Sequence, residues 1–225
     1  MPTINASKKG RIIGSTVSTQ AAARDAASGT HHDETDGESL AVQWFRSSGR
    51  GGGTMRYIRS FLYFDTSGVT GTVASATLKI RGAGTGTQTA DVIGVKSTAF
   101  GGDGGTNLAD ADFNNLDHST AYTDELAGAS WNTSANNDFT LTSTALTDIK
   151  DNNAFIIALI ESNSDYPDTD TGDLSHQTGI NFGSTLQIDY TLATGYSHDI
   201  MGLAAASIGK VSSLATANVG KVSGT

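Results

Sequence analysis

The sequence predicts an all-β protein built on an antiparallel β-sandwich. The chain is rich in glycine, with 27 among 225 residues, but contains only 2 prolines. Short runs of β-branched and aromatic residues are separated by Gly, Ser, Asn and Asp, which is typical of strands joined by turns. Strand and helix patterns do not alternate regularly along the chain, as they would in a protein with a parallel sheet. At this length the chain suits one large all-β domain with appended segments.

We expect three parts in chain order: an extended N-terminal arm (residues 1–28), the β-sandwich (residues 29–193) and a C-terminal repeat tail (residues 194–225). Within the arm, Ile12 and Ile13 suit a short strand, and residues 19–27 have mild helical propensity without an apolar stripe. The arm is therefore expected to lie outside the sandwich.

The first strands of the sandwich are expected at residues 40–45, 54–64, 73–80 and 90–95. Residues 54–64 become apolar on both faces toward their end, which is typical of a central strand. Residues 73–80 alternate most clearly, with Ala74, Ala76, Leu78 and Ile80 on one face. These four segments supply the first half of the predicted core.

A long excursion, residues 99–137, is rich in Gly, Asn and Asp. After it, strands are expected at residues 138–142, 154–160 and 183–191, and a short helix at residues 143–150 with Ser143 as its N-cap. Residues 154–160 form a continuous apolar run, as expected of a buried strand.

The formal net charge of −9 argues against general nucleic-acid binding, which needs clustered Lys and Arg. The chain has no cysteine, and no apolar stretch approaches the roughly 18 residues that span a bilayer. Residues 1–10 show no secretory signal. We therefore expect neither a nucleic acid nor a membrane as partner, and synthesis in a reducing cytoplasm. Assembly into a virus particle that is released by lysis would reconcile this with a polar, acidic, Gly- and Thr-rich surface.

The tail contains an 11-residue repeat. Residues 201–211 (MGLAAASIGKV) are followed by residues 212–222 (SSLATANVGKV), and a third unit begins at Ser223. Two glycines and several β-branched residues argue against a helix and favour an extended conformation. Because two units bury little surface, the tail is expected to need a partner: its own domain, a neighbouring copy or another particle protein.

The residues expected to carry assembly lie in the arm and the tail. They are Lys8, Lys9, Arg11, Ile12 and Ile13, together with Leu203, Ile208, Lys210, Val211, Leu214, Val219, Lys221 and Val222. The alternative is a solvated arm and a disordered linker.

Residues 59–67 (RSFLYFDTS), followed after a glycine-containing gap by residues 73–80 (VASATLKI), resemble the core motif of DNRLRE-type (disaggregatase-related) β-sandwich domains. Residues 184–190 (STLQIDY) are similar to the usual last strand of that family, and the resemblance covers roughly residues 30–192. It implies a jelly-roll-like sandwich similar to carbohydrate-binding modules, found in adhesins, cell-wall proteins and phage structural proteins. The tail repeat resembles repeats at the ends of structural proteins of environmental bacteriophages. The family implies the fold more strongly than any activity.

Residues 161–173 form an acidic loop with closely spaced oxygen ligands. A calcium ion bound by Asp165, Asp168, Asp170 and Asp173 is one interpretation, and a solvated acidic loop is the other. The cluster of His31, His32, Asp33, Glu34 and Asp36 is a weaker candidate for a metal, because adjacent residues of an extended chain face opposite sides.

Trp131 and Tyr166, which fall in predicted loops, are the candidates for stacking on a host-surface glycan. Trp44 and Tyr57 fall in strands and are expected in the core. No Gly-x-Ser-x-Gly, P-loop or His-Glu-x-x-His motif is present.

These observations predict a non-enzymatic bacteriophage virion protein that decorates or cements the outside of the capsid. Its expected partners are copies of itself and the major capsid or tail protein. The alternatives are a tail fibre or host-adhesion protein whose sandwich binds glycan, and a stand-alone carbohydrate-binding module. A polysaccharide-active enzyme is a more distant possibility.

Overall fold

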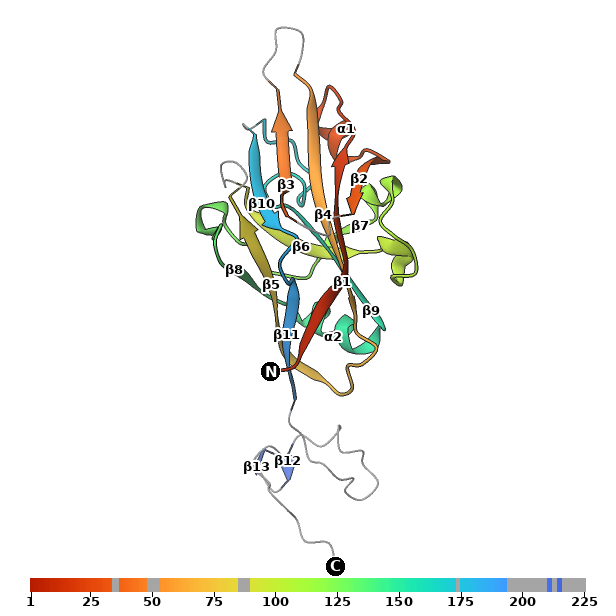
Figure 1. Ribbon diagram of the computed structural model, residues 1–225, viewed down its shortest axis with the longest axis vertical. Helices are drawn as coiled ribbons and strands as arrows, with labels where there is room; N and C mark the ends of the chain where they lie inside the picture. The colour runs from red at the N-terminus through yellow and green to blue at the C-terminus, as the bar shows by residue number, and fades with distance from the viewer. Residues whose placement is uncertain are drawn as a thin grey trace, which may run out of the picture.

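A computed structural model describes residues 1–33, 37–47, 53–84, 90–172 and 175–193, and the backbone of residues 210–211 and 214–215. The strands are β1 (Thr3–Gly14), β2 (Gly29–Asp33), β3 (Glu38–Arg46), β4 (Met55–Asp65), β5 (Val73–Ala83), β6 (Val92–Ser97), β7 (Leu116–Ala121), β8 (Asn136–Thr140), β9 (Ala154–Glu161), β10 (His176–Asn181), β11 (Gln187–Leu192), β12 (Lys210–Val211) and β13 (Leu214–Ala215) (Figure 1). The α-helices are α1 (Gln20–Arg24) and α2 (Ser143–Asp151), and short 3-10 turns are η1 (Phe100–Gly102), η2 (Asp110–Asn114) and η3 (Gly128–Ser130).

The all-β prediction is confirmed, and the sheet closes into a barrel. The ring runs β1-β11-β5-β10-β3-β4 and returns from β4 to β1, with antiparallel pairing at every step. β9, β6 and β7 extend the sheet from the second half of β4, while β2 lies beside β1 and β8 beside β5. Closure leaves the ring strands without a free edge over their paired lengths. The jelly-roll topology stays a prediction.

The N-terminal arm is a correction, because β1 is part of the barrel wall. Its residues pair with β4 from Ala6 opposite Phe64 to Ile13 opposite Ile58. On its other edge β1 pairs with β11 near the start and with β2 near the end. Ile12 is fully buried. The helix weakly favoured over residues 19–27 is present as α1, which covers the outer face of β4.

Two apolar cores lie on opposite faces of β4 and β9. Leu62 and Phe64 contribute to the core inside the barrel, whereas Phe61 belongs to an outer core under α1, η1 and η2. β9 is divided in the same way, with Ile157 and Ile156 on opposite sides. The central strand expected at residues 54–64 and the buried strand expected at residues 154–160 are therefore both confirmed.

Most of the other predicted elements are present in the structure, but their first and last residues differ from the predicted ones. Ala76, Leu78 and Ile80 of β5 point into the barrel core, as their alternation predicts, but Ala74 is exposed and Val73 joins that core instead, where the β5–β11 register shifts. Helix α2 is capped by Thr142, whose hydroxyl accepts a bond from Ala145 N at 3.4 Å, and Ser143 is its first residue instead of its cap. β2, β7 and β10 were not expected from the sequence. Among the described helices, none is long and apolar enough to cross a membrane.

Candidate functional site

The acidic loop folds back over the outer core and is held by arginines. Arg59, on β4, points outward from the barrel, and its Nη2 lies 2.6 Å from Asp165 Oδ1 while its Nε lies 2.9 Å from Oδ2. Both side chains are fully buried. Arg59 also donates to the carbonyls of Phe113 and Arg24, and its guanidinium lies 4.2 Å from the Phe113 ring centroid. A charge removed from water in this way needs such complete pairing.

Beside this ion pair, a hydrogen-bond network fixes the start of the loop. Glu161, at the end of β9, accepts bonds from the backbone N–H groups of Asn163, Ser164 and Asp165. The Ser164 hydroxyl lies 2.7 Å from Tyr57 Oη, which also accepts a bond from Gln20 Nε2 at 2.8 Å. Burial raises the pKa of Tyr57 to about 12, so this phenol is neutral at physiological pH.

The predicted calcium ligands do not converge on a common point. Asp165 pairs with Arg59, whereas Asp168 and Asp170 pair with Arg24 at 2.5 and 3.0 Å. Asp173 lies outside the described residues. Within the described segments, no group of three His, Asp or Glu side chains is arranged to hold a metal ion. The acidic loop is therefore matched by arginines of the same chain, not gathered around a cation.

Of the second metal candidate, the cluster at residues 31–36, the structure describes the partner of His31. His31 Nδ1 lies 2.6 Å from Asp110 Oδ1, and the same carboxylate accepts a bond from the His31 backbone N–H. These two bonds, from the backbone first and then the imidazole, lower the pKa of Asp110. Glu34 and Asp36 lie outside the described part of the chain. His31 thus fastens β2 to η2.

The basic residues assigned to the arm are engaged within the barrel. Lys8 Nζ donates to the carbonyls of Gly104 and Thr106, both at 2.7 Å, and Lys9 Nζ donates to that of Phe182. Arg11 Nη1 donates to the Leu40 carbonyl at 2.5 Å. These bonds hold β1 to β3 and to neighbouring loops, and the assembly role of the three residues stays a prediction. Ile13 is half-buried beside Ile12 in the same strand.

The two aromatic residues predicted to face a glycan are not exposed. Trp131 is 6% exposed, and its Nε1 donates to the Gly179 carbonyl at 3.1 Å while its ring meets Phe139 edge-on. Tyr166 is half-buried against the outer core. The predicted loop position of Trp131 is right, but the side chain turns inward. Trp44 and Tyr57 are core residues as expected, stacked with their ring centroids 4.8 Å apart.

Little can be placed from the tail. Lys210 and Val211 pair with Ala215 and Leu214 in a short antiparallel ladder that is separate from the barrel sheet. The other predicted docking residues lie outside the described residues: Leu203, Ile208, Val219, Lys221 and Val222. The ladder agrees with an extended conformation for those four residues.

A polar cavity of about 420 Å³ opens on the flank of the barrel, between the end of β6, the turn after η1 and the end of α2. Its lining includes Lys96, Asp103, Tyr122, Asp148 and Asp151. Neutral polar groups come from Ser97, Thr98, Asn152 and Asn153, and apolar contact comes from Ala154 and Ile156. The lining contributes three carboxylates and one ammonium, and the ammonium of Lys150 lies 3.2 Å from Asp151, so the surroundings are acidic on balance. The sequence did not single it out, because its lining comes from segments up to about 60 residues apart.

Asp148 organises the floor of the cavity. It accepts a bond from Lys96 Nζ at 2.8 Å and another from the hydroxyl of Tyr122. Burial opposes the charge of this carboxylate, but the bonds from Lys96 and Tyr122 lower the pKa of Asp148. Burial, and then the bond to Asp148, raise the pKa of Tyr122, which therefore remains a donor at neutral pH. The carboxylates of Asp103 and Asp151 are exposed: Asp103 Oδ1 accepts a bond from Gly105 N at 2.7 Å, and Asp151 Oδ1 lies 3.2 Å from Lys150 Nζ.

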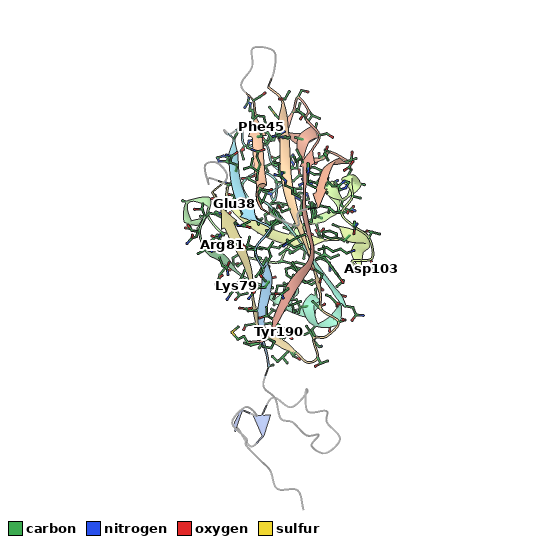
Figure 2. All side chains as sticks on the ribbon, in the orientation of Figure 1. Glu38, Phe45, Lys79, Arg81, Asp103 and Tyr190 are labelled. Atoms are coloured by element: carbon green, nitrogen blue, oxygen red, sulfur yellow. The ribbon has the colours of Figure 1, made fainter. Side chains whose placement is uncertain are left out.

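A second surface lies at one end of the barrel, formed by residues 1–3, 71–73 and 190–193, which we call the terminal pole (Figure 1). Tyr190 N donates to the Pro2 carbonyl at 3.0 Å, and Ala193 N donates to the Thr72 carbonyl at 2.7 Å. Met1 is 77% and Leu192 39% exposed, and within the described ranges these are the exposed large hydrophobic residues. Figure 2 shows Tyr190 near this pole and Phe45 near the opposite end, where β3 and β4 meet.

No protein-family model matches this sequence, and a search of the curated proteins finds no significant relative. The resemblance of residues 59–67 and 73–80 to DNRLRE-type domains therefore stays a prediction. What these residues do is visible: Arg59 anchors the acidic loop, and residues 73–80 form a barrel strand.

Proposed function

We propose that this protein is a non-enzymatic structural protein of a bacteriophage particle, and that it decorates or cements the outside of the capsid. On this proposal its β-rich domain is a jelly-roll-like module, and the repeat tail attaches it to neighbouring copies or to the major capsid or tail protein. The module would be assembled in the host cytoplasm and carried on the virion.

The terminal pole is the observation that carries this proposal. β1 begins and β11 ends there, side by side, so the tail that follows residue 193 starts at the same end of the barrel as residues 1–3. Met1 and Leu192 present apolar surface at this end. Exposed apolar side chains beside a segment too short to bury its own apolar residues favour a docking end. The opposite end would then face away from the particle.

The ion pairs of the acidic loop also support a structural role. The conspicuous charged residues of the acidic loop are used to hold the loop on the barrel. The glycan-binding alternatives would need contact residues other than Trp131, since that side chain packs against Phe139. A tail fibre or host-adhesion protein remains an alternative within the same class.

The proposal is tested on the full chain by sedimentation analysis of its self-association. Leu192→Asp should weaken association about tenfold or more, because burying a leucine contributes about 1.5–3 kcal/mol. Ala22→Asp, on the exposed side of α1, is the matched control and should leave association unchanged. Both variants should unfold in urea at the wild-type midpoint.

A second measurement addresses the particle itself. An antibody against the barrel, used with gold labelling in electron micrographs of phage particles from the source, should decorate capsids. Labelling of tail tips would favour the adhesion alternative. Unlabelled particles, together with a monomeric wild-type protein that Leu192→Asp does not change, would contradict the proposal.

A further inference from the structure

The charge of the chain is distributed unevenly between the barrel and the tail. The full sequence has 14 Lys and Arg against 23 Asp and Glu. Residues 194–225 contain two lysines, Lys210 and Lys221, and one acidic residue, Asp199, which leaves 12 basic and 22 acidic residues in residues 1–193. An acidic barrel therefore carries a weakly basic tail. Opposite charges of this kind steer association and fix its register.

The two lysines occupy the same place in the repeat. Each follows a glycine and precedes a valine, as Gly209-Lys210-Val211 and Gly220-Lys221-Val222. The glycine leaves room for close approach of a partner surface, and the valine offers an apolar contact. The tail sequence therefore contains two lysines in the same local context, each with a primary ammonium on a flexible side chain.

The polar cavity has the complementary character. Asp103, Asp148 and Asp151 line it together with a single ammonium, that of Lys96. Lys96 is paired with Asp148, so the carboxylates of Asp103 and Asp151 are not offset by that lysine. Asp151 has an exposed pairing at 3.2 Å with Lys150, in which the two side chains are 53% and 44% exposed. Such an exposed pair is weak and exchanges readily.

The cavity also suits the stem of a lysine. Ala154 and Ile156 supply apolar wall, and Asn152 and Asn153 supply amide oxygens beside the carboxylates. The methylene groups of an inserted lysine would contact Ala154 and Ile156, and its ammonium would lie among the amide and carboxylate oxygens.

We propose that the cavity receives Lys210 or Lys221 from the tail of a second copy of this chain. This inference rests on the proposed assembly role of the tail and names its acceptor. An extended chain spans about 3.3–3.6 Å per residue, so the 17 residues from Ala193 to Lys210 reach about 60 Å, enough to pass from one barrel to the next. The ladder of Lys210 and Val211 with Ala215 and Leu214 is separate from the barrel sheet.

Zero-length carbodiimide cross-linking of the full chain tests the contact, because it joins an amine to a carboxylate that touches it. A mixture of ¹⁴N- and ¹⁵N-labelled protein is coupled, digested and analysed by mass spectrometry. Mixed-isotope peptides that join Lys210 or Lys221 to Asp103 or Asp151 are expected. Peptides that join these residues only within one isotope would place the tail on its own barrel and overturn the proposal, as would exclusive coupling to other carboxylates.

Association measured by sedimentation gives an independent result. Asp103→Asn with Asp151→Asn, and separately Lys210→Gln with Lys221→Gln, should each weaken self-association roughly fivefold to tenfold, as expected for loss of one or two partly exposed charge pairs. Asp25→Asn with Asp124→Asn is the control for the barrel, since it removes the same charge from exposed sites outside the cavity. Lys79→Gln, on β5 and outside the cavity lining, is the control for loss of a lysine.

The two proposals fail in different ways. If removal of residues 194–225 abolishes association while the cavity and lysine variants behave like wild type, the tail docks elsewhere: the assembly role stands and the cavity assignment is overturned. If the wild-type chain does not self-associate and no inter-copy cross-links form, this inference fails whether or not the protein binds another virion protein.

Discussion

Arg59 and Asp165, which are 106 residues apart in the sequence, form a two-point ion pair in which neither side chain touches solvent. The pair joins the outer face of β4 to the loop that follows β9. Through the carbonyls of Arg24 and Phe113, the same guanidinium also holds α1 and η2. One side chain thus ties together the segments that cover the outer core.

Breaking this pair should be strongly destabilising. Asp165→Asn leaves the buried Arg59 charge without its counter-ion, and we expect a loss of about 3–5 kcal/mol in the free energy of unfolding by urea. Asp168→Asn is the matched control: its partner Arg24 is buried but Asp168 itself is 66% exposed, so the loss should be below about 1 kcal/mol. Replacing both partners, as Arg59→Met with Asp165→Leu, should cost less than the two single changes added together. Equal effects of Asp165→Asn and Asp168→Asn would contradict this account.

Tyr57 should give the protein a sensitivity to alkaline pH. Its pKa in the folded state is about 12, raised by burial from the ordinary value of 10. The unfolded chain therefore ionises this phenol first, so the stabilisation is complete below pH 10 and is lost as the pH rises from 10 through 12. Urea unfolding between pH 8 and pH 11.5 measures it.

Tyr57→Phe should flatten part of that alkaline decline. It also removes the bonds to Gln20 and Ser164, so at pH 7 it should cost about 1–2 kcal/mol. Tyr190→Phe, on the partly exposed β11, serves as the control. A decline of the same steepness in Tyr57→Phe as in wild type would show that other groups cause it.

Trp131 should behave as a core residue and not as a ligand contact. Trp131→Ala removes a side chain that packs on Phe139 and donates to the Gly179 carbonyl, and we expect a loss of about 3–5 kcal/mol in the free energy of unfolding. Trp131→Phe should cost less, because it keeps most of the apolar contact. A fully stable Trp131→Ala variant with altered glycan binding would restore the earlier expectation for this residue.

Alanine substitutions at Gly104 and Gly102 should separate the effect of backbone strain on stability from the effect of a steric clash. Both have a positive φ, 79° and 81°, which disfavours any other L-residue. A Cβ at Gly104 would lie 2.3 Å from the Tyr63 ring, whereas nothing lies within 4 Å of one at Gly102. Gly102→Ala should cost about 1 kcal/mol from strain alone. Gly104→Ala should cost more, and Tyr63→Ala should recover the difference if the clash is its cause.

The strands that could be predicted from the sequence are those whose own residues carry the signal. β4, β5 and β9 contain apolar runs or strict alternation, and these depend on no distant partner. β1 was assigned to an arm because Lys8, Lys9 and Arg11 interrupt its apolar pattern. Their ammonium and guanidinium groups donate to the carbonyls of Gly104 and Phe182, in loops, and of Leu40, in β3, all distant in the sequence. Hydrogen bonds between residues so far apart cannot be predicted from the pattern of a short stretch of sequence.

The acidic loop illustrates the same limit for sites. Asp165, Asp168 and Asp170 have the spacing of cation ligands, but the cations that meet them are Arg59 and Arg24. A loop position likewise suggested that Trp131 is exposed, although it packs inside the barrel. The polar cavity could not be predicted, because it exists only when β6, η1 and α2 meet.

The pairing of β1 with both β4 and β11 has a consequence for the order of synthesis. β1, the first strand of the ring in chain order, can pair with β4 once residue 65 is synthesised and with β11 only after residue 187. Until β11 is synthesised, the edges of β1 and β5 that pair with it stay unpaired. Pairing between strands so far apart in the sequence is slow. The ring therefore cannot be completed on a partial chain. Closing it is among the last events of folding, and it fixes the place from which the tail departs.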